Sequence, residues 1–219
     1  MDLSYVARIL PALLNGALTT LALFALVLPL SLPLGFLITL CASCRFKPVK
    51  WLAQAYIFVM RGTPLMLQLF FFYFGLPFIP VIGPYLRLTS FSAAALSFTL
   101  NYAAYFAEIF RGGLLSIDKG QYEVSHVLGL TSFQTMTRVI IPQMIRVTLP
   151  SIGNEAITLV KDTALVASIA LPEILHYAKG IVTRDFTTTP FIVAAFIYLL
   201  ITFIVTVLFK FVERKVNYE

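Results

Sequence analysis

Long segments without a single charged residue constrain this chain more than any other feature of its sequence. Four of them are 9–44, 62–86, 88–107 and 186–209. Each can hold the roughly 20 apolar residues that cross about 30 Å of hydrocarbon as a helix. A further stretch, 147–172, is long enough but contains Glu155, Lys161 and Asp162. It either buries ionisable groups within a span or does not span at all.

These segments predict an all-α integral membrane protein with about five membrane helices in a single domain, 1–219. After a short amphipathic N-terminal segment, the expected helices are 13–40, 51–76, 91–111, 147–171 and 190–210. The second is interrupted at 61–64, where Thr63 precedes Pro64 and a helix stop and restart is natural. Irregular backbone at membrane depth is tolerated only where protein or a water-filled cavity covers it.

The composition excludes several classes of protein. The chain is 59% hydrophobic and only 12% charged, against about 25% charged residues in ordinary soluble domains. Its net charge of +6 comes largely from basic residues in short loops, which is typical of membrane orientation and not of a nucleic-acid-binding face. Cys41 and Cys44 lack a second pair, so no metal site is expected. The first apolar run is far longer than the core of a cleaved signal peptide.

The distribution of basic residues predicts the orientation in an inner membrane. One side carries only Arg8, Arg87, Lys179 and Arg184. The other side carries Arg45, Lys47, Lys50, Arg111, Lys119, Arg138, Arg146, Lys210, Arg214 and Lys215. Cytoplasmic loops carry the excess of Lys and Arg. We therefore expect the N-terminus outside, the C-terminus in the cytoplasm and 112–146 as the longest cytoplasmic segment.

That segment has the pattern of a compact helix–turn–helix. Residues 117–128 can form a short helix, and Gly129 is a natural left-handed stop for it. Thr131 or Ser132 can then cap a second helix that runs toward Pro142. A loop built this rigidly between two spans suits a lever on which a partner presses.

The same loop resembles the cytoplasmic signature of ABC-importer permeases. That signature is Glu-Ala-Ala, three residues, Gly, nine residues and Ile-x-Leu-Pro. This chain has Glu123, Val124, Ser125, Gly129 and Val139–Pro142 at the same spacing. Further segments are similar to the polar-amino-acid branch of the family, namely 61–68, 101–113, 120–121, 149–150, Asn154 and 161–165.

The resemblance implies the transmembrane domain of a type I ABC importer and a set of partners. Such permeases pair as homo- or heterodimers, two cytoplasmic ATPase subunits grip the loop, and an external binding protein delivers the substrate. The residues that the resemblance assigns to ATPase coupling are Gln121, Glu123, His126 and Gly129. Glu123 can accept from an arginine of the docking protein, or it is a plain acid at a helix start. His126 is either a contact or merely exposed.

This chain is expected to be non-catalytic and to bind no cofactor. It contains no G-x-x-x-x-G-K-[ST] sequence, so ATP and magnesium belong to the partner ATPase. An intramembrane enzyme is disfavoured, because no G-x-S-x-G or H-E-x-x-H motif occurs. A stand-alone channel or secondary carrier would explain buried acids but not the rigid cytoplasmic loop.

The candidate substrate site is built around Glu155, which lies near the middle of the fourth predicted helix. Thr158 and Asp162 fall on its face, at i+3 and i+7. Asn101 lies at comparable depth in the third helix, and Thr63 lies in the break of the second. A buried carboxylate without a partner is costly, and a cationic cargo would supply one. An internal salt bridge or a protonated Glu155 is the alternative.

Other charged residues are expected to have structural roles. Lys161 and Asp162 can neutralise each other, so for Asp162 a structural role and a substrate role are both open. Arg61 is expected to fix the second helix, and Glu108 to pair with Arg111 near the inner boundary. Family members that carry basic amino acids look similar at the Asn101–Glu155 pair, which favours arginine, lysine, ornithine or histidine as cargo. Neutral cargo such as glutamine or cystine stays open, because every amino acid has an α-ammonium group.

Overall fold

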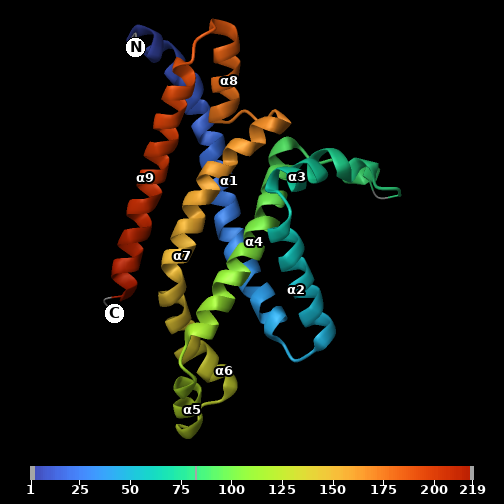
Figure 1. The fold of residues 1–219 in the computed structure, drawn as a ribbon, viewed down its shortest axis with the longest axis vertical. Coiled ribbons are helices and arrows are strands. Elements are labelled where there is room, and N and C mark those ends of the chain that lie inside the picture. The colour runs from blue at the N-terminus through green and yellow to red at the C-terminus, as the bar shows by residue number, and fades with distance from the viewer. Residues whose placement is uncertain (1–2, 82, 218–219) are drawn as a thin grey trace.

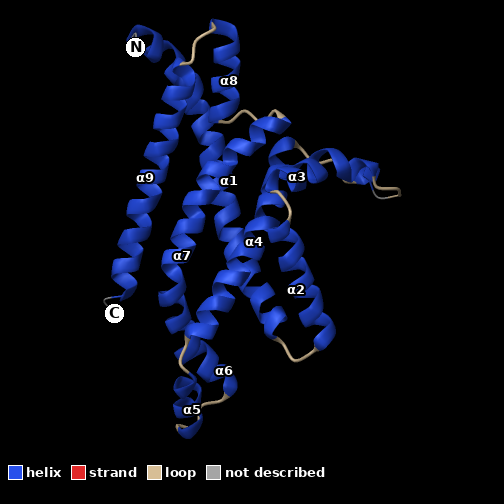
Figure 2. Cartoon of the chain, in the orientation of Figure 1, coloured by secondary structure: helices blue, strands red, loops and turns tan. Residues whose placement is uncertain are grey.

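The computed structural model describes residues 3–81 and 83–217, which form helices joined by loops and contain no strand (Figure 2). The helices are α1 (Leu3–Ser43), α2 (Lys47–Gly62), α3 (Leu65–Phe70), α4 (Ser90–Ser116), α5 (Lys119–Val127), α6 (Ser132–Thr135), α7 (Ile141–Asp162), α8 (Ile174–Asp185) and α9 (Thr189–Asn217). Shorter π or 3-10 turns lie at Phe71–Gly75, Leu76–Phe78, Gly83–Tyr85, Met136–Ile140 and Thr163–Ile169. The predicted all-α architecture is confirmed.

The two ends of the bundle differ in what they carry. Figure 1 shows the N-terminal end of α1 beside α8 at one end, and α5 and α6 at the opposite end. The turn between α1 and α2 and the C-terminal end of α9 point toward the α5–α6 end. The segments predicted to share a membrane side therefore lie toward the same end of the bundle.

Two of the described helices, α1 and α9, are long and apolar enough to cross a membrane. α2 and the segment Leu65–Phe78 make a third if the bent pair counts as one span. α4 has 27 residues and α7 has 22, which at 1.5 Å per residue gives about 40 and 33 Å. These two are long enough to cross but more polar. The outer face of α9 is apolar and open, with Phe196 and Phe203 each 63% exposed, as suits contact with lipid.

Small residues on α1 allow it to pack closely along α4. A Cβ atom at Gly35 would lie 2.8 Å from the carbonyl oxygen of Ala103, so the two backbones meet there. One turn away on either side, Ser31 Oγ donates to the carbonyl of Thr99 (3.3 Å) and Thr39 Oγ1 donates to that of Ala107 (2.8 Å). In lipid the hydrophobic effect does not drive helices together. Membrane helices instead associate through close packing of small residues and through hydrogen bonds from hydroxyl groups across the interface.

The N-terminal part of the chain differs from the prediction of a separate amphipathic segment. α1 begins at Leu3 and continues for 41 residues through Pro11, Pro29 and Pro33. Interior prolines are tolerated in membrane helices because neighbouring groups take over the freed backbone bonds. The predicted segment is therefore the first turns of the same helix.

The interruption predicted at 61–64 in the second helix, 51–76, is confirmed. α2 ends at Gly62, and the chain beyond it turns by 104°. Thr63 has an extended backbone (φ −114°, ψ 146°), because the ring of the following Pro64 disfavours the helical region for the residue before it. The chain then continues as α3, so the interruption is a sharp corner.

The fourth predicted helix, 147–171, begins earlier and is followed by a helix that was not predicted. α7 begins at Ile141 and ends at Asp162, and α8 follows after a 3-10 turn. Glu173 caps α8 and accepts from the backbone N–H groups of Leu175 (2.8 Å) and His176 (2.6 Å). Tyr198 Oη of α9 donates to the same carboxylate at 2.5 Å. Glu173 thus joins α8 to α9.

Glu173 is 0% exposed, which makes its removal costly. In Glu173→Ala, three partly buried donors lose their acceptor, at about 1–3 kcal/mol for each unsatisfied group. We expect the midpoint of thermal unfolding in detergent to fall by about 5 °C or more. Glu213→Ala, at the far end of α9, is the matched control and should leave the midpoint unchanged. An unchanged midpoint for Glu173→Ala would contradict this role.

Candidate functional site

A cavity of about 370 Å³ lies where the corner after α2 meets α4 and α7. Its walls are formed by Arg61, Gly62, Thr63, Pro64, Leu65, Asn101, Tyr102, Tyr105, Glu155, Thr158 and Asp162. All five residues predicted for substrate contact are among them, namely Thr63, Asn101, Glu155, Thr158 and Asp162. The structure brings these residues together at one cavity. Their contact with substrate stays a prediction.

A polar network fixes the corner after α2. Asn101 Nδ2 donates to the carbonyl of Met60 (2.9 Å) and to Gln68 Oε1 (3.0 Å). Gln68 Nε2 donates to the same carbonyl (2.9 Å) and to Thr63 Oγ1 (2.7 Å), and Thr63 Oγ1 donates to the carbonyl of Val59 (2.8 Å). The last carbonyls of a helix have no partner within it. Asn101 and Gln68 supply donors to them, so both amide hydrogens of Asn101 are used and its Oδ1 is left for the cavity.

The two acids of α7 have different surroundings. Asp162 Oδ2 accepts from Tyr102 Oη of α4 at 2.7 Å. The expected Lys161–Asp162 pair is not formed, since no salt bridge within 4.0 Å joins them in the described residues, and the Lys161 side chain is exposed. Glu155 has no hydrogen bond or salt bridge in the described part of the chain, and its side chain is partly exposed at the cavity wall. Glu155 is therefore the acid that is open to a ligand.

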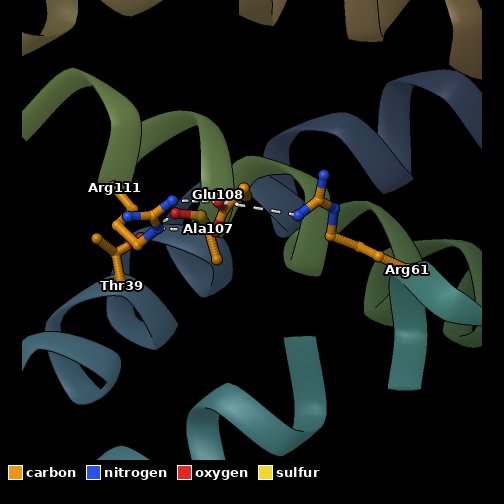
Figure 3. Close-up of polar contacts among 5 residues, drawn as sticks. All are labelled: Thr39, Arg61, Ala107, Glu108 and Arg111. Atoms are coloured by element: carbon orange, nitrogen blue, oxygen red, sulfur yellow. Dashed lines mark hydrogen bonds and ion pairs between the residues drawn. The ribbon is translucent and has the colours of Figure 1, made fainter. Parts of the chain in front are cut away.

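Arg61, which was expected to have only a structural role, contacts several groups at the cavity. It lines the cavity, its guanidinium lies 5.3 Å from the ring of Tyr105, and Nη1 lies 4.0 Å from Glu108 Oε1. Glu108 is bound through two bonds by Arg111, as expected, with Arg111 Nε donating to Oε2 at 2.9 Å. Figure 3 shows Glu108 between the two arginines.

Sequence reasoning missed three residues of the cavity and its frame. Gln68 is the sole side-chain amide of the uncharged segment 62–86, and that isolation was the signal that could have revealed it. Tyr102 and Tyr105 lie one helical turn apart on α4, but aromatic residues are common in membrane helices. No sequence signal separates these two from packing residues.

The segment 112–146, which is predicted to be cytoplasmic, has the expected helix–turn–helix geometry. Asp118 Oδ1 caps α5 by accepting from the N–H of Gly120 (2.7 Å). Gly129 has a left-handed backbone (φ 72°), and the N–H of Leu130 bonds to the carbonyl of Ser125 at 3.0 Å, which is the Schellman stop. Thr131 and Gln134 then form a capping box at the start of α6.

The predicted coupling residues lie on this rigid frame. Glu123 and His126 are exposed. Gln121 Oε1 accepts from Gln143 Nε2 at 3.2 Å, which ties α5 to the start of α7. Glu123 is the fifth of the nine residues of α5, and the acid at the helix start is Asp118. The alternative that Glu123 is a plain helix-start acid is therefore wrong.

With this geometry established, comparison with known proteins decides the family. The profile of the binding-protein-dependent transport system inner membrane component family matches residues 31–218. The chain belongs to this family. It is a permease subunit of the amino-acid ABC-importer type. The type I importer fold that the resemblance implied is confirmed.

Individual relatives match this permease over nearly its whole length. It is 38% identical to the arginine transport system permease protein ArtQ of Bacillus subtilis, over 99% of both chains. It is 34% identical to the L-cystine transport system permease protein TcyB of the same organism, over 94% of this chain and 87% of the relative. A crystal structure of an amino acid ABC transporter with histidines has a chain that superposes with a TM-score of 0.88 at 33% identity, covering 98% of this chain and 99% of that one.

The network at the corner can be tested with Gln68→Met. The substitution keeps the length of the side chain but leaves the Met60 carbonyl with fewer donors, and Gln68 is only 8% exposed. Loss of its bonds should cost about 1–3 kcal/mol and lower the unfolding midpoint in detergent. Leu67→Met, on the exposed face of the same helix (59%), is the control. Equal midpoints for both variants would contradict the role assigned to Gln68.

Proposed function

We propose that this permease imports basic amino acids through the cavity between α2, α4 and α7. The observation that carries the proposal is the set of charges at the cavity wall, where Glu155 and Asp162 provide two carboxylates and Arg61 one guanidinium. A basic amino acid carries two cationic groups and one carboxylate, which is the complementary set. A volume of about 370 Å³ lies in the range of small-molecule sites.

Each charge has a role in this proposal. Glu155, which lacks an ion pair among the described residues, receives one cationic group of the cargo. Asp162, whose position Tyr102 fixes, receives the other. Arg61 binds the α-carboxylate, since guanidinium–carboxylate pairs are strong and directional. A charge left without a partner in a partly buried site is costly, and this cost disfavours cargo with a single cationic group.

A neutral polar amino acid such as glutamine or cystine is the second candidate. The bond from Tyr102 to Asp162 favours it, because that bond already compensates part of one carboxylate. Glu155 would then be the acid for the α-ammonium group. Relatives named for arginine and for L-cystine are both similar to this chain, so uptake measurements must separate the two.

We further propose that partner ATPases drive transport through α5 and α6. Glu123 and His126 are exposed on α5 and offer polar groups to a docking protein. Gln121 bonds the same helix to α7, and Gly129 has the left-handed backbone of the turn that follows. ATP and magnesium are bound by the two ATPase subunits. A second permease subunit and an external binding protein complete the importer, with the α5–α6 end in the cytoplasm and the N-terminus outside.

Glu155→Gln tests the cargo. The substitution removes the negative charge and keeps the shape, so uptake of labelled L-arginine by cells with the whole transporter should fall about tenfold to 100-fold, as expected for loss of a charged hydrogen bond of about 1.5–3 kcal/mol. Glu213→Gln, on α9 away from the cavity, is the matched control. Arginine uptake equal to wild type in Glu155→Gln would remove Glu155 from the site.

Glu123→Arg tests the coupling to an ATPase. Reversal of the charge should abolish recovery of a P-loop ATPase when the permease is purified from its own membranes in mild detergent, because the docking bond becomes a repulsion. Glu213→Arg makes the same change of charge elsewhere and should still recover the ATPase. Uptake that follows an ion gradient without ATP, and no ATPase with wild type, would favour the stand-alone carrier.

A further inference from the structure

A second cavity adjoins the proposed substrate cavity. It has a volume of about 540 Å³ and is lined by Ala42, Gln54, Ile57, Phe58, Arg61, Gly62, Glu108 and Arg111. Arg61 and Gly62 line both cavities. A Cβ atom at Gly62 would meet no atom within 4 Å, so open space lies around this residue. Arg61 therefore lies on the border between the two cavities.

Arg61 is under the influence of two carboxylates, one on each side of this border. Glu108 Oε1 lies 4.0 Å from Arg61 Nη1 on the side of the second cavity. Glu155 lies on the wall of the first cavity, which Arg61 also lines. The Arg61 side chain is 39% exposed, and the long flexible side chain leaves it free to approach either acid.

Glu108 is held more firmly than Arg61. Arg111, three residues further along α4, binds both oxygens of the Glu108 carboxylate. This bidentate geometry fixes where the negative charge stands, as Figure 3 shows. Arg61 faces that fixed charge from α2, and the ring of Tyr105 lies 5.3 Å from its guanidinium. In the row Arg111–Glu108–Arg61, Glu108 is thus held by two hydrogen bonds from Arg111 and by one longer ion-pair contact from Arg61, at 4.0 Å.

We propose that Glu108 is a positioning residue that holds the guanidinium of Arg61 away from Glu155, so that Glu155 stays free for the cationic group of the cargo. Glu108 is the one acid among the residues that line the second cavity, so without its charge the carboxylates nearest the Arg61 side chain are those of the first cavity, where Glu155 lacks a hydrogen bond within the described residues. Arg61 then pairs with Glu155 and competes with the cargo as an internal cation. Glu108 sets substrate affinity in this way without touching the substrate. The inference rests on the proposed use of Glu155.

The test is a double-mutant cycle on uptake by cells that carry the complete transporter. Glu108→Gln should raise the KM for labelled L-arginine about fivefold, the effect of an ion pair worth about 1 kcal/mol, with a much smaller change in maximal rate. Glu108→Asp keeps the charge and should stay within about twofold of wild type. In an Arg61→Gln background, Glu108→Gln should change KM no further, because no internal cation is left to compete.

The outcomes separate the two proposals. An equal rise of KM with Glu108→Gln in both backgrounds would overturn the positioning role. Failure of wild type to take up arginine would instead overturn the basic-cargo proposal. The cycle is then measured with labelled L-glutamine or L-cystine, because their α-ammonium group also competes with the Arg61 guanidinium for Glu155. If Glu108→Gln does not accumulate in the membrane, Arg111→Gln releases the Glu108 carboxylate from its clamp. Arg111→Gln should raise the KM about twofold. This rise should be absent in the Arg61→Gln background.

Discussion

The corner after α2 depends on hydrogen-bond partners for the backbone carbonyls at the end of that helix, and the cavity depends on the corner. A chain that turns by 104° inside a membrane protein leaves helix-end carbonyls without intrahelical partners, and lipid cannot replace them. Gln68 and Asn101 donate to the Met60 carbonyl, and Gln68 also bonds Thr63. These amides come from α3 and α4, so one network sets the bend and joins three helices. The space beside it is the cavity.

The helix content and most of the spans could be predicted, because long uncharged segments have few alternatives in a membrane. The helix–turn–helix at α5 and α6 could also be predicted, since Gly129 and Thr131 act through local backbone chemistry that sequence carries directly. The direction of the chain after Gly62 could not. Pro64 signals a break, but the angle of the break is set by bonds from Asn101, a residue 41 positions away from Met60.

The candidate site was predictable in the same uneven way. The positions of Asn101 and Glu155 along their predicted helices placed both at a similar depth in the membrane, and in the structure both line the cavity. Contacts between helices were beyond reach: Asp162 bonds Tyr102 of another helix and not its neighbour Lys161, and Glu173 is buried among donors from α8 and α9. Residues adjacent in sequence point to different sides of a helix, and Glu173 lies between the fourth and fifth predicted helices, where no helix was expected.

The continuity of α7 has a mechanical consequence. The helix begins directly after the π turn Met136–Ile140 that leads out of α6, and it carries Glu155 and Asp162 near its other end. Gln143, on its first turn, is bonded to α5, and Glu155 lies 12 residues further on, about 18 Å at 1.5 Å per residue. Pro150 interrupts the hydrogen bonding between these two points, but Glu155 and Asp162 both lie beyond it, so a shift of this end of α7 would move the two carboxylates together. Under the proposed function, this displacement would separate the cargo from its anionic partners.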